Sequence, residues 1–378
     1  MTPPRPILLP GLPRVWHGPH TLQLGLTPPR AVLLDLRDPA AARVLDLLDG
    51  TRTESGLLSQ ARDQGIPPDQ AQALLGTLQS AGLVLPAHHL HPESMPQRLS
   101  AEAAALAYAR PDDPPARVLR RRAEARIAVT GRGRLAPGIA VALAESGIGH
   151  VQPDLPGPVT PADLPGGPLP PATLGLPRAQ ATAAAIQQAA PSTKTHPIRR
   201  GAASLVIQLN YDQPVALLAA AHARRRQPYL AVTIREAKPV IGPLVRPATP
   251  PCLNCIARHR QDRGTQLNPP SDWPLTPPAR PVQPLSPGED RPPGPGFPPG
   301  HPSLTARPTG LVEPCAAVTL LAATAFAVGE ALVFLDGGTP ETLGAEVEIS
   351  APGRVRRRSW PAHPDCDCGR PRPRTKRT

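Results

Sequence analysis

The sequence predicts an α/β protein in which a small winged-helix-like module precedes a Rossmann-like α/β domain with a structural zinc site made of four cysteines. Three observations predict this. The first 86 residues combine short strands with three short helices, apolar strand-like runs alternate with helices after residue 126, and two cysteine pairs lie far apart in the sequence. A chain of 378 residues is long enough for two or three domains, which excludes a small disulfide-stabilised scaffold.

Residues 1–86 form the first predicted unit. Strand-like runs surround Leu22 and Leu34, three helical segments follow between residues 42 and 82, and Leu83 opens a closing strand. Such a module can read DNA through a helix, add a peptide as a strand at a sheet edge, or dock without a ligand. Basic residues are few here, so we expect edge-strand capture of a peptide, with a plain docking domain as the alternative.

Residues 87–125 are predicted to form a linker with one helix. After them the sequence changes to alternating apolar strand and helix patterns. Residues 127–130 form a short apolar strand, Gly131-Arg132-Gly133 a glycine turn, residues 138–146 a helix, and a second strand ends near Asp154. Strand, turn, helix and strand in this order are typical of a nucleotide-binding α/β unit. The spacing G-x-G-x-x-x-x-G is equally compatible with a tight turn that binds no phosphate.

The remaining elements extend this domain to residue 370. Strands at 204–209 and 229–234, separated by a helix, predict a parallel sheet. Segment 265–310 is proline-rich, with fifteen prolines between residues 268 and 308, and predicts exposed, extended chain. An apolar helix at 316–334 and a strand at 345–349 follow.

Composition and charge exclude several classes of protein. The best candidate for a membrane span, residues 316–334, contains Glu330 and polar residues that suit a core helix better, and no signal peptide is recognisable, so we expect a cytoplasmic protein without a membrane partner. The formal charge of +12 is concentrated near the C-terminus, and residues 371–378 form a basic tail. We interpret this tail as a solvated end and expect no nucleic-acid partner.

The five cysteines predict a metal site rather than disulfides. Cys252 and Cys255 form a CxxC pair, and Cys366 and Cys368 form a CxC pair. Four thiolates satisfy tetrahedral Zn²⁺ without an open position, so the predicted zinc is structural. A redox CxxC is the alternative. Two histidines beside the pairs, at 259 and 363, could replace a thiolate, but we expect them to be exposed.

Several of these segments resemble the adenylyltransferases of the ThiF and ubiquitin-activating-enzyme type. The resemblance is greatest to an actinobacterial branch found beside YcaO cyclodehydratases that make azole or azoline peptides. The matching segments are LDLLDGTRT (45–53), VIGPLVRPATPPCLNCIARHRQDR (240–263), EPCAAVTLLAATAFAVGEALVFLDG (313–337) and RRRSWPAHPDCDCG (356–369). The resemblance implies a ThiF-type ATP-binding fold that activates a carboxylate as its acyl-adenylate with ATP and Mg²⁺.

Site residues implied by this resemblance match the family pattern in part. Gly131 and Gly133 match the glycine loop and Asp154 the ribose-binding acid, while Arg134 replaces a glycine. Arg178 stands in place of the catalytic lysine, and the metal-binding aspartate corresponds to Asp212. A bulky side chain at 134 would obstruct close approach to phosphate, so we expect a degenerate ATP site. We expect Cys315, which forms a covalent link in some relatives, to be a buried thiol here.

Together these features predict an accessory protein of ribosomal-peptide modification. It would bind the leader of a precursor peptide and present it to a YcaO-type cyclodehydratase that performs the chemistry. The alternative is an active adenylyltransferase that acts on a peptide or carrier-protein carboxylate. A homodimer is expected by analogy with relatives.

Overall fold

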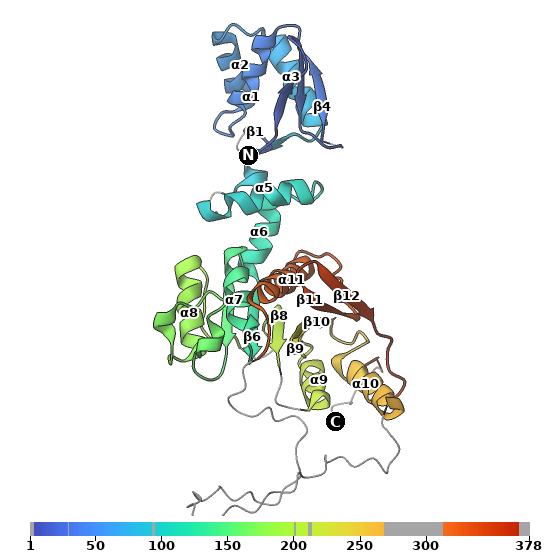
Figure 1. Ribbon diagram of the computed structural model, residues 1–378. Helices are drawn as coiled ribbons and strands as arrows, with labels where there is room; N and C mark the ends of the chain where they lie inside the picture. The colour runs from blue at the N-terminus through green and yellow to red at the C-terminus, as the bar shows by residue number, and fades with distance from the viewer. Residues whose placement is uncertain are drawn as a thin grey trace, which may run out of the picture.

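The computed structural model describes residues 4–28, 30–92, 95–199, 202–210, 214–267 and 313–369. Figure 1 shows a small N-terminal unit, a pair of helices, and a larger α/β domain stacked in this order. Asp212, the basic tail 371–378 and the proline-rich segment beyond residue 267 lie outside the described residues. What was predicted for them therefore stays a prediction.

The N-terminal unit contains two small sheets and three helices. The helices and three of the strands were predicted, whereas the strands at 6–8 and 14–16 were not. Its elements are β1 (Pro6–Leu8), β2 (Arg14–Trp16), β3 (Thr21–Leu24), β4 (Val32–Asp35), α1 (Val44–Leu47), α2 (Glu54–Asp63), α3 (Pro68–Ser80) and β5 (Val84–Pro86). Strand β1 pairs with β5, and β2, β3 and β4 form an antiparallel sheet in that order. Its likeness to a winged helix stays a prediction.

The segment expected to be a linker contains the helices α4 (Ala87–Leu90), α5 (Ser100–Ala109) and α6 (Pro115–Glu124). Leu90, Leu106 and Leu119 from these helices are buried in the same hydrophobic core as Leu24 and Leu75 of the N-terminal unit. Helices α5 and α6 therefore extend the first core toward the α/β domain, as Figure 1 shows.

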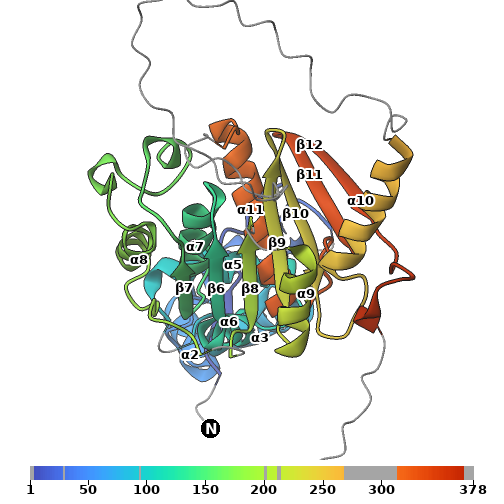
Figure 2. The ribbon, with the colours of Figure 1, turned by 90° about the horizontal axis from the view of Figure 1, so that it is seen from below.

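A seven-stranded sheet forms the centre of the α/β domain, in the order β12-β11-β10-β9-β8-β6-β7 (Figure 2). Its members are β6 (Arg126–Gly131), β7 (His150–Asp154), β8 (Leu205–Leu209), β9 (Tyr229–Arg235), β10 (Lys238–Val245), β11 (Ala345–Ala351) and β12 (Arg354–Ser359). The four strands β7, β6, β8 and β9 are parallel, and β9 to β12 are antiparallel. The sheet is therefore mixed, and the expectation of a parallel sheet was correct for only one half.

A two-residue hairpin causes this change of direction. Arg235 pairs with Lys238, and the two residues between them, Glu236 and Ala237, have positive φ angles of 48° and 68°. Positive φ at both central positions is the type I′ geometry that joins antiparallel strands. This turn was not predicted from the sequence, because Glu236-Ala237 lacks the Asn-Gly or Asp-Gly signature of such hairpins.

Helices cover both faces of the sheet. They are α7 (Leu135–Glu145), α8 (Arg178–Ala189), α9 (Val215–Arg224), α10 (Leu253–Leu267) and α11 (Ala317–Leu335). Helices α7 and α11 pack together and share the main core with β6 and β8, whereas α9 and α10 contribute to a smaller core with Tyr229 and Cys252.

Helix α11 is long and apolar enough to cross a membrane by length and composition alone. It nevertheless belongs to the fold. Leu320 and Ala327 are buried in the main core. The buried Glu330 carboxylate accepts hydrogen bonds from the backbone and hydroxyl of Thr342 at 2.7 and 2.6 Å.

Candidate nucleotide loop and metal centre

The predicted glycine turn joins β6 to α7, and both of its glycines are required by the backbone. Gly131 and Gly133 have φ angles of 108° and 136°, a region that other residues rarely adopt. A Cβ at Gly131 would lie 1.9 Å from the carbonyl oxygen of Leu209 on the neighbouring strand. The glycines therefore have a packing role of their own, with or without a phosphate nearby.

Arg134 directly follows the glycine turn, and its side chain binds backbone carbonyls of two other segments of the chain. Its side chain is buried, with the residue only 8% exposed, and its guanidinium donates to the carbonyls of Pro165, Glu313 and Cys315 at 3.1, 3.2 and 2.7 Å. Segment 313–315 is thereby held against the start of α7. The side chain that we expected to obstruct phosphate at position 134 is therefore held in place by three hydrogen bonds.

The carboxylate of Glu313 binds at the N-terminal end of α7. One carboxylate oxygen accepts the backbone N–H of Arg134 at 2.9 Å, and the other accepts the amide Nδ2 of Asn210 at 2.8 Å. Thr233 donates to Asn210 Oδ1 at 2.5 Å and so fixes the orientation of that amide. Helix N-termini attract anions, including the phosphates of nucleotides. Here an internal carboxylate already occupies such a position.

Asp154 lies at the same edge of the sheet as the glycine turn. It ends β7, is exposed, and accepts a hydrogen bond from Thr130 Oγ1 at 3.2 Å. Thr130 and Asp154 are register partners on the parallel strands β6 and β7. The structure therefore brings Gly131, Gly133 and Asp154 together at the carboxyl edge, where open α/β sheets bind their ligands.

Arg178 is engaged within its own loop. At the first position of α8, it donates to Asp163 Oδ2 at 2.9 Å and to the carbonyl of Pro156 at 2.8 Å, and its side chain is only 12% exposed. This ion pair neutralises the cation that the resemblance assigned to catalysis. Asp212, its predicted catalytic partner, is outside the described residues.

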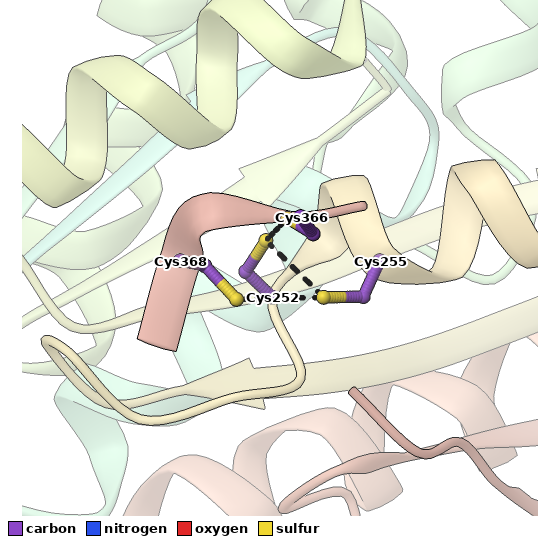
Figure 3. A group of neighbouring side chains, drawn as sticks. All are labelled: Cys252, Cys255, Cys366 and Cys368. Atoms are coloured by element: carbon purple, nitrogen blue, oxygen red, sulfur yellow. Dashed lines mark hydrogen bonds between the residues drawn. The ribbon is translucent and has the colours of Figure 1, made fainter. Parts of the chain in front are cut away.

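The four predicted cysteine ligands converge from two distant segments. Cys252 and Cys255 lie at the start of α10, and Cys366 and Cys368 at the short helix η5 (Asp367–Gly369), as Figure 3 shows. The Sγ atoms of Cys252 lie 3.9 Å from Cys255 and 3.7 Å from Cys366, and those of Cys255 and Cys368 are 3.4 Å apart. A tetrahedral ion with bonds of about 2.3 Å to sulfur separates its ligands by roughly 3.8 Å. The cluster therefore fits a metal ion.

Burial shapes the chemistry of these sulfurs. It raises the pKa of the Cys252 thiol above its usual range and that of Cys368 to about 11. Without a cation Cys252 and Cys368 keep their protons, whereas a bound metal ion displaces these protons and coordinates the thiolates. The amide of Asn254 donates to Cys366 Sγ at 3.5 Å and orients that ligand.

A second group, formed by His259, Asp262 and His363, lies beside the cysteines. His363 is buried, contrary to the expectation that it would be exposed. Its Nδ1 accepts the backbone N–H of Asp365 at 3.1 Å, which leaves Nε2 to donate to Asp262 Oδ2 at 2.8 Å. Both ring nitrogens are engaged, so this group supports the fold rather than offering a free ligand.

Sequence reasoning missed Glu313 and Asn210. Glu313 falls within the segment EPC that precedes α11, but the chain gives no signal that a residue so distant in sequence would reach the start of α7. Asn210 follows β8 and has a positive φ of 23°, which places its amide over the turn.

The whole architecture is similar to that of MccB from E. coli. In the complex of MccB with AMPCPP and MccA, the match has a TM-score of 0.58 and 14% sequence identity, and it covers 96% of this chain and 98% of that one. The chain has the fold of MccB. The microcin C7 biosynthetic enzyme MccB with N-formylated MccA matches with a TM-score of 0.57 at the same identity over 96% and 99% of the two chains.

A second similar structure is the heterocyclase TruD. It matches with a TM-score of 0.54 and 18% identity over 97% of this chain but only 43% of TruD. No protein-family model and no curated protein matches the sequence.

Proposed function

We propose that this protein binds the leader segment of a ribosomally made precursor peptide and presents it to a YcaO-type cyclodehydratase. In this proposal the α/β domain is a scaffold without adenylation activity of its own. The observation that carries the proposal is the occupied helix N-terminus at the glycine turn, combined with an N-terminal unit that retains an open sheet edge.

The occupied turn argues against ATP chemistry in this chain. A nucleotide phosphate at the start of α7 would have to displace the Glu313 carboxylate and would meet the anchored Arg134. The Arg178 guanidinium is already neutralised by Asp163. An adenylating site needs cations that are free to offset phosphate charge, and these two arginines are committed elsewhere.

The N-terminal unit supports peptide binding. Strand β4 pairs only with β3 among the described strands, and its Leu33 side chain is 66% exposed. An extended peptide can add to such an edge, with main-chain hydrogen bonds that provide affinity and side-chain contacts that provide specificity. MccB, whose likeness spans the whole chain, has been crystallised with MccA.

The partial coverage of TruD supports a separate catalytic partner. The present chain matches less than half of that heterocyclase. In our proposal a separate chain, a YcaO-type enzyme, supplies the catalytic part that the matched portion lacks.

We propose Zn²⁺ as the ion of the cysteine cluster. Four thiols at tetrahedral spacing leave no open position for a substrate, so the ion would be structural. It would join α10 to the C-terminal segment and thereby close the domain. A homodimer is the oligomeric state that we propose by analogy.

The peptide-binding proposal can be tested with a displayed random-peptide library panned on the full-length protein. Enriched peptides would be synthesised with a fluorophore, and their affinity measured by anisotropy. Leu33→Asp should weaken binding by about tenfold or more, because it places a charge beside the edge strand. Leu217→Asp is the matched control, since Leu217 on α9 is also exposed, at 61%. Failure to enrich any peptide, or equal loss in both variants, would contradict the proposal.

A further inference from the structure

An open cavity of about 770 Å³ lies where the N-terminal unit meets α5 and α6. Leu12, Leu26 and Leu85 line it from the N-terminal unit, and Tyr108 lines it from α5. Leu26 is 63% exposed, so the cavity presents apolar surface to solvent. Apolar surface in a concave site is typical of a place where a ligand side chain binds.

Arg30 is held ready at this cavity. Its guanidinium lies 4.7 Å from the centre of the Tyr108 ring and donates one hydrogen bond to the carbonyl of Ala107 at 2.8 Å. Tyr108 is itself fixed by a hydrogen bond to the carbonyl of Pro10 at 3.1 Å. The stack and the single hydrogen bond restrict Arg30 while leaving most of its donors available.

The charges around the cavity favour an anionic ligand. No aspartate or glutamate is among the described residues that line it. Arg110 also lines it but donates to the backbone of Asp336 at 3.0 Å, and burial lowers the pKa of His89 so that its ring is neutral at pH 7. Arg30 is therefore the cation that a carboxylate entering the cavity would meet.

The cavity also adjoins the open sheet edge. It lies at the end of the sheet where β3 finishes at Leu24 and β4 begins at Val32, two residues after Arg30. A peptide added along β4 would pass this point. The cavity therefore lies beside one end of the strand to which the proposed function assigns the peptide.

We infer that this cavity is the specificity pocket for the bound peptide, and that it takes an aliphatic or aromatic side chain whose neighbouring Asp or Glu pairs with Arg30. This inference rests on the proposed function and deepens it. The partner is therefore an extended peptide with an apolar residue beside an acidic one. Arg30 is half-buried, and a charge-assisted hydrogen bond to such a group is worth on the order of tenfold in affinity.

Parallel library selections on wild-type protein, Arg30→Glu and Arg37→Glu test the inference. Arg37 is exposed in the same unit but does not line the cavity. Wild-type protein and Arg37→Glu should enrich peptides with an acidic residue next to an apolar one, whereas Arg30→Glu should enrich basic residues at that place. An unchanged acidic consensus on Arg30→Glu, or no acidic preference on wild type, would overturn the inference and leave peptide binding intact. No enrichment on any protein would contradict the proposed function itself.

A second measurement guards against misfolding of the charge-reversed variant. Arg30→Gln keeps a polar side chain at this position but removes the charge. It should bind the synthetic acidic peptide about tenfold more weakly than wild type, and should bind the peptide with its Glu changed to Gln as tightly as wild type does. Equal losses for both peptides would show that Arg30 does not contact the carboxylate.

Discussion

Arg122 and Asp336 form a buried bidentate ion pair although they lie 214 positions apart in the sequence. The Nε and Nη2 atoms of Arg122 lie 3.0 and 2.7 Å from the two carboxylate oxygens, and both side chains are at most 4% exposed. Arg122 belongs to α6, and Asp336 is the C-cap residue that follows α11. The pair therefore fastens the helices next to the N-terminal unit to the α/β domain.

Removing Asp336 should be costly because it leaves a buried guanidinium without its main partner. We expect Asp336→Ala to lower the free energy of unfolding by about 3–5 kcal/mol. Asp46→Ala, which breaks the exposed pair with Arg14, should cost less than about 1 kcal/mol. Urea unfolding followed by tryptophan fluorescence measures both, and similar losses would contradict the structural role assigned to the buried pair.

His222 should make the protein sensitive to acid. Burial, assisted by Arg225, lowers its pKa from 6.5 to about 4, and neither ring nitrogen has a hydrogen-bond partner among the described residues. Between pH 6.5 and about 4, His222 therefore binds a proton in the unfolded chain but not in the folded chain. The free energy of unfolding consequently decreases as the pH falls through this range. His222→Phe, which can keep the stacking on Tyr229, should reduce this loss by on the order of 2 kcal/mol. His17→Phe, on the exposed β2–β3 connection, is the matched control variant.

Metal removal should loosen the α/β domain. Cys366→Ser is expected to reduce the zinc content well below one ion per chain and to lower the melting temperature, since the ion links two segments far apart in sequence. Cys315→Ser serves as the control because Cys315 is not part of the cluster. Metal analysis and thermal melts decide the matter. A metal-free protein with unchanged melting would rule out the proposed structural site.

Opening the glycine turn should restore room for a phosphate. In the double variant Arg134→Gly with Glu313→Ala, the N-terminal end of α7 loses both its anchored side chain and its internal carboxylate. We expect fluorescent ATP analogues to bind this variant at least about tenfold more tightly than wild type. Equal binding by the two proteins would mean that Glu313 and Arg134 do not close the site.

Local patterns predicted much of this fold but not its long-range contacts. The strand ending at Gly131, the helices at 317–335 and 54–63 and the convergence of the four cysteines follow from periodicity and spacing. Strand β10 was missed because Pro239 and Pro243 interrupt its pattern, and β12 because its exposed arginines look like the beginning of a basic tail. Both strands form by pairing with β11, and a contact between distant segments of this kind leaves no local pattern in the sequence.

The candidate site shows the same division. The sequence indicated that Arg134 would disturb the glycine turn, because the side chain alone carries that information. It could not indicate that Glu313 would bind there, since that contact joins residues 179 positions apart and depends on the packing of α7 against α11. Arg178 was predicted to stand in place of the catalytic lysine, and the fold pairs it with Asp163.

Pyrophosphate exchange measures directly whether the α/β domain adenylates a carboxylate. Purified wild-type protein, supplied with ATP, Mg²⁺ and a peptide enriched from the library, should exchange labelled pyrophosphate into ATP no faster than a protein-free control. Exchange well above that background, and abolished by Asp212→Ala, would show a working adenylation site and contradict a purely scaffolding role for the α/β domain.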